Sequence, residues 1–336
     1  MVEPSNADLA AKLGINPKAK REFYDLVIVG SGPAGLTTDL YAAREGIETL
    51  VIEKGGIGGQ AGVTERIDNY SGFVDGIGGA ELADQMRTHA ERFDVEILSA
   101  QTVTSIQSDG DHKMITSESG DEYCSNAVLL APGTRYRRLG VPGEEDLIGA
   151  GIHFCATCDG PFYKDKEVVV VGGGNSGIEE GLFLTKFASK VTVLEFMDRL
   201  GASQILREKA ENHPKMEIRL RYAVQEFKGE EHLESIIVQD RVTGENQELF
   251  PSAAFIFIGL DPNTDFVKDV VETDKWGFIT TSGTMETSME GVFAAGDARG
   301  GSTKQVASAV GEGATAALMI RNYLEKQQGN RGYKGD

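Results

Sequence analysis

Hydrophobic and polar positions alternate along the chain in blocks that predict strands and helices in turn. Apolar runs of strand length occupy residues 25–29 and 49–52, and a Gly-rich turn with a helical stretch that reaches Glu45 lies between them. Continuous apolar runs of this length are typical of parallel strands buried on both faces. The pattern predicts an α/β fold from Tyr24 onward, after a polar extension at residues 1–22.

The turn after the first strand has the form of a dinucleotide-binding fingerprint. It reads Gly30-Ser31-Gly32-Pro33-Ala34-Gly35, and the second strand ends in Glu53, 23 residues after the first glycine. In this arrangement the helix N-terminus holds a pyrophosphate and the acid holds a ribose. These residues predict a first dinucleotide site.

The same order returns 142 residues later. An apolar run at 167–171 precedes Gly172-Gly173-Gly174-Asn175-Ser176-Gly177, a helical stretch follows at 178–186, and a strand at 191–194 ends in Glu195. An internal repeat of this kind indicates two copies of one structural unit. The repeat predicts a second dinucleotide site.

A pair of cysteines stands just before the second copy, in His153-Phe154-Cys155-Ala156-Thr157-Cys158-Asp159-Gly160. Two thiols at this spacing can exchange with another disulfide, because the second thiol stays within reach of the mixed disulfide. Asp159 can donate or accept the proton that this exchange moves. The one further cysteine, Cys124, leaves too few ligands for a structural zinc site, so no metal is predicted.

Composition narrows the class of protein. The chain has 336 residues, is 40% hydrophobic and carries a net charge of −19, which opposes binding to nucleic acid or to anionic membranes. It contains no run of 18 apolar residues and no secretory signal pattern, and three cysteines are too few for a secreted disulfide framework. We expect a soluble, cytoplasmic protein.

Further segments indicate a flavin at the first site. The Gly55–Gln60 segment offers backbone N–H groups to a large ligand, with a flexible loop as the alternative. A short apolar strand ends in Gly296-Asp297, and a helix begins near Gln305. Asp297 is a candidate partner of a ribityl hydroxyl, with a helix cap as the alternative. A hydride donor, a flavin and a disulfide each exchange two electrons, so the three fit one relay.

Taken together, these residues resemble the low-molecular-weight thioredoxin reductase family of flavoproteins from about Tyr24 to Lys326. The segments that carry the resemblance stand in the family's order: Gly30-Ser31-Gly32-Pro33-Ala34-Gly35, Gly58-Gly59-Gln60, Asn69, Ala131-Pro132-Gly133-Thr134, Cys155-Ala156-Thr157-Cys158-Asp159-Gly160, Gly172-Gly173-Gly174-Asn175-Ser176 and Ala295-Gly296-Asp297.

The resemblance implies two Rossmann-like three-layer dinucleotide-binding domains, the second inserted in the first. Residues 23–135 and 260–336 would bind FAD, and residues 136–259 would form a pyridine-nucleotide-type domain that carries the disulfide. It also implies a homodimer whose domains rotate about hinges at residues 133–136 and 259–263, so that the disulfide faces the flavin and the protein substrate alternately.

The resemblance also assigns residues to each site. Cys155, Cys158 and Asp159 would be catalytic, with Cys158 nearer the flavin. The implied FAD ligands are Gly30, Ser31, Gly32, Pro33, Ala34, Gly35, Glu53, Lys54, Gly58, Gly59, Gln60, Asn69, Ala131, Gly133, Gly296, Asp297, Gln305 and Val306. The second nucleotide site would comprise Gly172, Gly174, Asn175, Ser176 and Glu195.

One departure from the family concerns the electron donor. NADPH-dependent members resemble one another in a His-Arg-Arg segment and a further Arg that grip the 2′-phosphate, whereas this chain reads Glu195-Phe196-Met197 and Gly201. NADPH is therefore predicted to be a poor donor, and NADH a possible one. Alternatively the second fingerprint only supports the fold, and ferredoxin or a reduced flavin supplies electrons. Tyr333, in a tail that is disordered by default, would favour this alternative if it stacked on the flavin.

The predicted function is transfer of two electrons from a donor, through FAD and the Cys155–Cys158 disulfide, to a thioredoxin-like protein. The alternative from another class is a flavin-binding regulatory protein without turnover. The retention of both cysteines and of Asp159 argues against that alternative.

Overall fold

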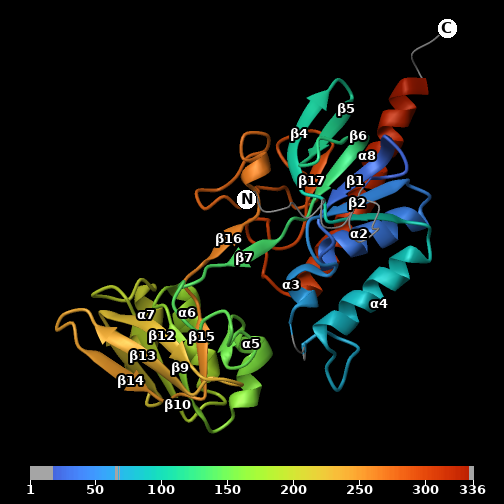
Figure 1. Ribbon diagram of the computed structural model, residues 1–336. Coiled ribbons are helices and arrows are strands. Elements are labelled where there is room, and N and C mark those ends of the chain that lie inside the picture. Colours follow the sequence, from blue (N-terminus) through green and yellow to red (C-terminus); the bar gives the residue numbers. More distant parts are fainter. Residues whose placement is uncertain (1–17, 65–66, 68, 333–336) are drawn as a thin grey trace, which may run out of the picture. The chain divides into compact units, whose positions relative to one another are not determined.

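The structure is a computed structural model that describes residues 18–64, 67 and 69–332. The chain divides into two compact units, Met1–Arg135 with Asp261–Asp336, and Tyr136–Leu260. Each unit contains a parallel sheet with helices packed on it (Figure 1). The predicted α/β fold, with one nucleotide-binding unit inserted in another, is confirmed.

The first unit is built on a mixed sheet in the order β3-β2-β1-β6-β5-β4, with β17 also paired to β6. Its parallel strands are β1 (Phe23–Val29), β2 (Thr49–Glu53), β3 (Glu96–Ser99), β6 (Glu122–Leu130) and β17 (Val292–Ala294). Its antiparallel strands are β4 (Val103–Asp109) and β5 (His112–Ser117). The carboxyl ends of four parallel strands, β1, β2, β6 and β17, therefore lie at one edge.

The helices of the first unit are α2 (Pro33–Arg44), α3 (Gly59–Gly62), α4 (Gly79–Glu91) and α8 (Val306–Gly332), with the 3-10 turn η2 (Asp265–Val267). Helices α2 and α8 pack closely because small residues meet. The Thr38 hydroxyl donates to the Gly313 carbonyl over 2.9 Å, and a Cβ atom at Gly313 would lie 2.4 Å from the Ala34 carbonyl oxygen. The helix predicted to begin near Gln305 begins at Val306 and ends at Gly332.

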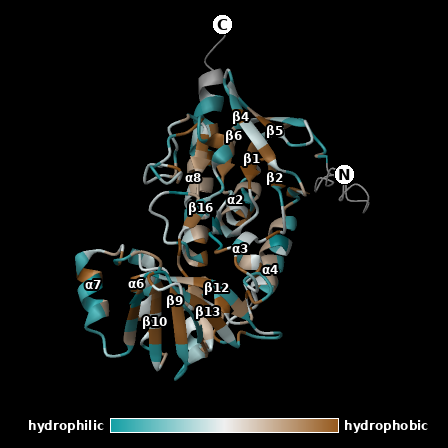
Figure 2. Cartoon of the chain, turned by 60° about the vertical axis from the view of Figure 1, so that its left-hand side comes forward, coloured by the Kyte–Doolittle hydropathy of each residue, from teal (hydrophilic) through white to brown (hydrophobic). Residues whose placement is uncertain are grey.

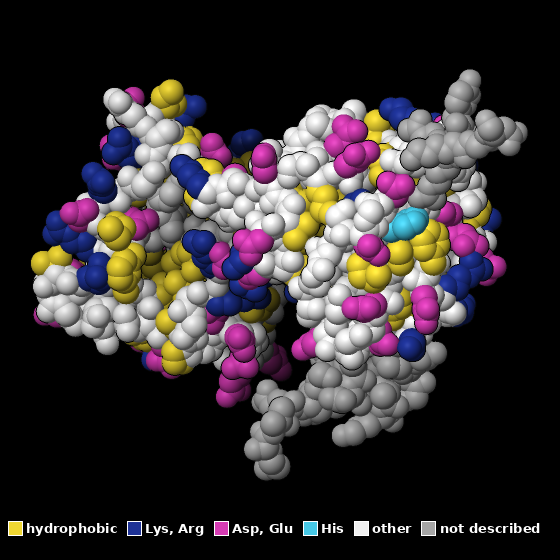
Figure 3. All heavy atoms as spheres, turned by 90° about the horizontal axis from the view of Figure 1, so that it is seen from above, with side chains coloured by type: hydrophobic (Ala, Val, Ile, Leu, Met, Phe, Trp, Pro, Cys, Tyr) yellow, Lys and Arg dark blue, Asp and Glu magenta, His cyan; other side chains and the backbone are white. Residues whose placement is uncertain are grey.

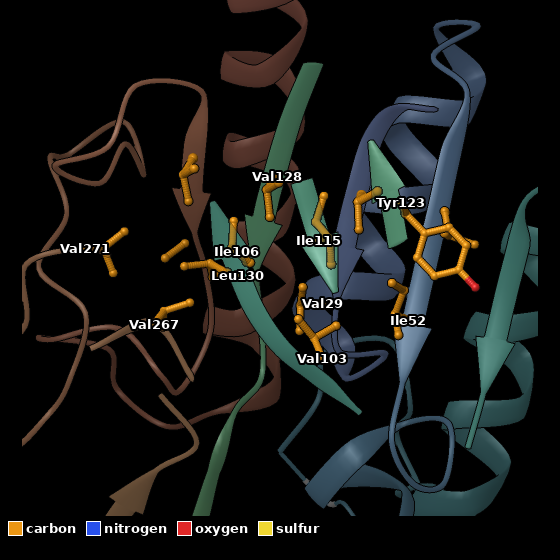
Figure 4. Close-up of a cluster of buried hydrophobic side chains, with 14 of the residues drawn as sticks. Val29, Ile52, Val103, Ile106, Ile115, Tyr123, Val128, Leu130, Val267 and Val271 are labelled. Atoms are coloured by element: carbon orange, nitrogen blue, oxygen red, sulfur yellow. The ribbon is translucent and has the colours of Figure 1, made fainter. Parts of the chain in front are cut away.

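Both faces of the central strands are buried, which accounts for their continuous apolar sequence. In β1, Val27 and Val29 pack into one cluster, whereas Leu26 and Ile28 pack into another beneath α2 and α8. The first cluster, drawn in Figure 4, joins the sheet to the segment that carries Val267 and Val271. The side chains that the sheet contributes to this cluster include Val29, Ile52, Val103, Ile106, Ile115 and Leu130.

The second unit has three layers. Its parallel sheet has the order β11-β10-β9-β15-β8, formed by β8 (Ile152–His153), β9 (Glu167–Val171), β10 (Lys190–Glu195), β11 (Met216–Leu220) and β15 (Ala253–Ile256). One layer of helices contains α5 (Ala156–Asp159), η1 (Gly160–Tyr163), α6 (Asn175–Leu184) and α7 (Gln204–Glu211). The other layer is an antiparallel sheet of β12 (Tyr222–Lys228), β13 (Ser235–Asp240) and β14 (Asn246–Leu249).

The valine run of β9 supplies both interfaces of these layers. Val168 and Val170 pack with the helices, and Val169 and Val171 pack with the antiparallel sheet. Figure 2 shows the difference in hydropathy between the buried strands β9 and β10, which are mostly hydrophobic, and helix α7, which is largely hydrophilic. Alternating side chains of one apolar strand thus hold three layers together.

The chain passes between the units twice. The connecting strands β7 (Thr134–Tyr136) and β16 (Leu260–Pro262) pair with each other as a two-stranded sheet. Gly259, just before β16, has a φ of +116° and its backbone lies against the Arg137 side chain, so a side chain at this position would be strained.

The surface is mixed in charge. Acidic and basic side chains are interspersed on the face shown in Figure 3. Within residues 18–64, 67 and 69–332, no helix combines the length and the apolar character needed to cross a bilayer.

A buried carboxyl group in α2 had no signal in the sequence. Asp39 is fully buried, its Oδ1 atom accepts a hydrogen bond from the Thr49 hydroxyl, and no described residue donates to its Oδ2 atom. Burial raises the pKa of Asp39 to about 7, although the Thr49 hydrogen bond acts in the opposite direction. The folded protein therefore favours the neutral acid.

Replacing Asp39 by asparagine tests this ionisation. A folded-state pKa of about 7 against an ordinary value of 3.8 corresponds to about 4 kcal/mol of unfolding free energy, lost as the pH rises from about 4 to about 7. We expect Asp39→Asn to be more stable than wild type above pH 7 by about 1–3 kcal/mol, because its amide avoids the charge but leaves an N–H unpaired. Urea unfolding at several pH values measures the difference.

The exposed Asp111 provides the control. Asp111→Asn should follow wild type at every pH. A difference between Asp39→Asn and wild type that stayed constant from pH 4 to pH 8 would contradict the assignment.

Candidate redox and nucleotide-binding sites

The first Gly-rich turn closes the carboxyl ends of three strands. The Gly30 N–H donates to the Ile52 carbonyl over 2.9 Å, and a Cβ atom at Gly30 would lie 2.3 Å from the carbonyl oxygen of Ala131. With a φ of +102°, Gly30 also occupies a conformation that disfavours other residues. Only glycine lets β1 turn this close to β6.

The side chain of Glu53 accepts hydrogen bonds from this turn. Its Oε2 atom accepts hydrogen bonds from the Ser31 N–H over 2.7 Å and the Ser31 hydroxyl over 2.9 Å, and its Oε1 atom accepts one from the Gly55 N–H over 2.7 Å. The side chain is buried. The predicted ribose ligand is thus also the acceptor that fixes the turn.

The turn leaves the start of α2 open to a ligand. Gly32 is the N-cap of α2, without a side-chain cap, and a Cβ atom there would meet no atom within 4 Å. Gly35, one turn later, would place a Cβ atom 2.0 Å from the Gly30 carbonyl oxygen. The free N–H groups of the first helical turn and the space above Gly32 fit a pyrophosphate.

Other predicted FAD ligands gather in the same unit. Asn69 and Gln305, 236 residues apart, share a hydrogen bond of 2.9 Å from the Asn69 amide to the Gln305 carbonyl oxygen. The Gly58 N–H donates to the Ser31 carbonyl over 2.9 Å, and Gly58 begins α3 rather than a flexible loop. A pocket borders the turn, and its lining includes Gly30, Glu53, Lys54, Gln101 and Asn263.

The Gly296-Asp297 segment lies against α2, since a Cβ atom at Gly296 would lie 3.0 Å from that of Ala34. Burial raises the pKa of Asp297, and the Lys304 ammonium acts against that rise. Lys304 donates to the Asp297 backbone carbonyl and lies 4.3 Å from the centre of the Phe278 ring.

Glu312 was not predicted. It accepts the Gly296 N–H over 2.7 Å and pairs with Arg299 over 2.7 Å. Its signal in the sequence was only an acid within the run of mostly small residues at 306–317.

The second Gly-rich turn repeats the geometry of the first. The Gly172 N–H donates to the Leu194 carbonyl over 2.9 Å, and Glu195 accepts the Gly173 N–H over 2.5 Å and the Met197 N–H over 2.8 Å. Gly174 is the uncapped N-cap of α6, and a Cβ atom there would meet nothing within 4 Å. The second turn therefore keeps the shape of a pyrophosphate site.

The neighbourhood of Glu195 differs from a 2′-phosphate site. Phe196 is 53% exposed and Met197 is 57% exposed, at positions where arginines were expected for NADPH. Arg241 lies over the Phe196 ring, 3.5 Å from its centre, and donates to the Phe196 carbonyl over 2.8 Å. On the other side, the Ser203 N–H donates to the Asn175 side chain over 2.7 Å.

The cysteine pair forms a disulfide on α5. Its Cα atoms are 5.3 Å apart, and the Cys158 N–H donates to Cys155 Sγ over 3.2 Å. Both cysteines are half-buried, as is Asp159 in the same turn. The Asp159 carboxylate lies 3.5 Å from Nδ1 of His153, a residue to which the sequence assigned no role.

Tyr333 lies outside the described residues. Cys124 is a half-buried free thiol of β6, and burial raises the pKa of its thiol, so it is a weak nucleophile at neutral pH. In the described part of the chain, no group of three or more His, Cys, Asp or Glu side chains is placed to hold a metal ion.

Comparison with known proteins gives the family. The pattern of the pyridine nucleotide-disulphide oxidoreductases matches residues 24–313. Thioredoxin reductase of Bacillus subtilis strain 168 is 40% identical over 311 residues, which cover 92% of this chain and 98% of that protein. The chain belongs to the low-molecular-weight thioredoxin reductase family. Family membership makes it a thioredoxin reductase-like flavoenzyme and implies FAD as its cofactor.

Other members of this family agree in sequence and fold. The thioredoxin reductase structure from Streptococcus pyogenes has a TM-score of 0.86 at 40% identity and covers 91% of this chain and 99% of its own. A bifunctional thioredoxin reductase/thioredoxin of Mycobacterium leprae is 38% identical over 320 residues, which cover 95% of this chain and 70% of that protein.

Two alanine substitutions separate the nucleotide sites. At Gly32 and Gly174 the backbone is extended and the protein leaves room for a methyl group, so neither Gly32→Ala nor Gly174→Ala should change the unfolding free energy of the apoprotein by more than about 0.5 kcal/mol. We expect Gly32→Ala to weaken FAD binding at least roughly 10-fold, because the methyl group occupies the pyrophosphate space. Fluorescence titration of the apoprotein with FAD measures this.

Gly174→Ala is the matched control, since it should bind FAD as wild type does. Equal FAD affinity in Gly32→Ala and wild type would contradict the placement of the pyrophosphate.

Proposed function

We propose that the protein is a thioredoxin-disulfide reductase that passes two electrons from a donor, through FAD and the Cys155–Cys158 disulfide, to a thioredoxin-like protein. The observation that carries the proposal is the disulfide on α5 with Asp159 in the same turn, in a unit inserted into a nucleotide-binding fold. Support for the partner comes from the relatives, one of which is named as a reductase and a thioredoxin in a single protein.

Each unit has its own part in this proposal. Residues 23–135 and 260–336 hold FAD, with α2 at the pyrophosphate and Asp297 at the ribityl chain, and residues 136–259 carry the disulfide. FAD, when bound there, would supply the two-electron redox chemistry that links the donor to the disulfide. A homodimer, rotation about residues 133–136 and 259–263, and a cytoplasmic location are further parts of the proposal that derive from the family resemblance.

The reduced pair then exchanges with the partner. One thiolate of Cys155 or Cys158 attacks a sulfur of the partner disulfide, so a mixed disulfide forms and the partner's bond breaks. The sulfur that leaves takes a proton from Asp159. The other enzyme thiol attacks the mixed disulfide, which restores the Cys155–Cys158 bond and releases the partner as a dithiol.

The proposed donor lacks a 2′-phosphate. A carboxylate at Glu195 repels a phosphate and accepts ribose hydroxyls, and Phe196 and Met197 carry no charge. The nearby Arg241 guanidinium is stacked on the Phe196 ring and donates to the Phe196 carbonyl. The intact geometry of the second turn favours NADH. The alternative donors are reduced ferredoxin and a reduced flavin, which stacking by Tyr333 would favour; Tyr333 lies outside the described residues.

A cysteine series tests the route of the electrons. We expect Cys155→Ser and Cys158→Ser to lower thioredoxin reduction at least roughly 1,000-fold, because neither can form the disulfide that both half-reactions need. Cys124→Ser should retain wild-type turnover. Unchanged turnover in Cys158→Ser would contradict the catalytic role of the pair, whereas a wild type without turnover would favour the regulatory protein.

An anaerobic titration tests the donor. NADH is expected to bleach the flavin band of the wild-type protein, and NADPH is expected to do so at least roughly 10-fold more slowly, because Glu195 repels its phosphate. The double substitution Phe196→Arg and Met197→Arg should raise kcat/KM for NADPH and leave that for NADH within about 3-fold. Equal rates with both nucleotides in the wild type would contradict the proposal, and bleaching by reduced ferredoxin alone would select that donor.

A further inference from the structure

A buried histidine connects Asp159 to a tyrosine. His153 is the last residue of β8 and is 7% exposed. Its Nδ1 atom lies 3.5 Å from Oδ2 of Asp159, and its Nε2 atom lies 2.6 Å from the hydroxyl oxygen of Tyr163. Both ring nitrogens therefore face a group that can hold a proton.

The surroundings leave the ring few other polar contacts. The Phe255 ring of β15 and the Tyr163 ring of η1 each lie 5.3 Å from it, centre to centre. Helix α5 contributes Asp159, and α6, which packs against α5, carries the acids Glu179 and Glu180. The ring is thus enclosed by apolar surface, with Asp159 and Tyr163 as its polar partners.

The contacts of His153 with Asp159 and Tyr163 are both favourable only when a proton lies between Nδ1 of His153 and the Asp159 carboxyl group. If the Tyr163 hydroxyl donates to Nε2, the neutral ring carries its hydrogen on Nδ1 and presents it to the carboxylate. If Nε2–H donates to the tyrosine oxygen, Nδ1 presents a lone pair, and the contact is favourable only when Asp159 is protonated. In both tautomers the pair shares one proton.

We propose that His153 is a positioning residue for proton transfer by Asp159, and that Tyr163 fixes the histidine ring. His153 holds the Asp159 carboxyl group in place while that group passes a proton from an enzyme thiol to the thiolate that leaves. The inference rests on the proposed function, because it concerns the exchange step with the partner disulfide.

The step balances in atoms and electrons. The attacking enzyme thiolate forms one sulfur–sulfur bond as the partner's bond breaks, and the second enzyme thiol repeats this to restore the Cys155–Cys158 disulfide. Two electrons pass from the enzyme dithiol to the partner, and the two protons of the enzyme thiols end on the partner's sulfurs. Asp159 takes each proton from an enzyme thiol and gives it to the sulfur that leaves, so Asp159 and His153 both end as they began.

The experiment follows the exchange step alone. The holoenzyme is reduced with dithionite and mixed anaerobically with oxidised Bacillus subtilis thioredoxin, and the rate of thioredoxin reduction is measured from pH 5.5 to pH 9. His153→Phe keeps an aromatic ring beside Phe255 but holds no proton. We expect it to lower the rate at pH 7 by roughly 10-fold to 100-fold and to change the shape of the pH profile.

Two further variants separate positioning from packing. His153→Asn places an N–H donor near the position of Nδ1, so we expect it to recover much of the rate without restoring the wild-type pH profile. His232→Asn, at an exposed histidine of the same unit, should match wild type throughout. A pH profile of His153→Phe identical in shape to that of wild type would overturn the inference, whatever its effect on stability.

A double-mutant cycle gives the decisive comparison. If His153 acts through Asp159, the double substitution His153→Phe and Asp159→Asn should be no slower than Asp159→Asn alone. Losses that multiply would overturn the inference.

The same assay is repeated with a small aromatic disulfide in place of thioredoxin. This second oxidant separates the test of His153 from the test of the proposed function. Failure of the wild type with thioredoxin alone would overturn the proposed partner, whereas the profiles of wild type and His153→Phe with the small disulfide would still decide the role of His153.

Discussion

The structure depends on a carboxylate that accepts backbone N–H groups of a Gly-rich turn. Glu53 does this for Ser31 and Gly55 in the first unit, and Glu195 does it for Gly173 and Met197 in the second. A buried N–H without a partner costs about 1–3 kcal/mol, so each acid stabilises its turn substantially. The turn also orients the helix that follows, whose uncapped N-terminus is the proposed phosphate site.

The same scaffold serves two chemical purposes within one chain. In the first unit Asn69 bonds to Gln305, and the Gly296-Asp297 segment lies against α2, in the part of the chain that we propose to hold FAD. In the second unit the equivalent turn adjoins a short helix with a disulfide and a network of proton-holding side chains. Insertion of one unit in the other brings both into one polypeptide with two connecting strands.

The sequence predicted what local patterns determine. The runs at 25–29 and 167–171 are apolar after their first residue because both faces of those strands are buried. Gly30, Gly35 and Gly172 stand where a Cβ atom would clash with the backbone. Contacts between distant segments gave no such signal. The burial of Asp39 against Thr49, and the position of His153 between Asp159 and Tyr163, depend on how elements pack rather than on periodicity.

The backbone contacts of Glu195 also shape how this lineage can change. The carboxylate stabilises the fold because it accepts two backbone N–H groups, whereas more than half of the surface of Phe196 and of Met197 is exposed to solvent. Exposed positions tolerate substitution with little loss of stability. Substitutions of these two side chains can therefore adapt the protein to a different electron donor while Glu195 is retained. Each variant along that course should still fold.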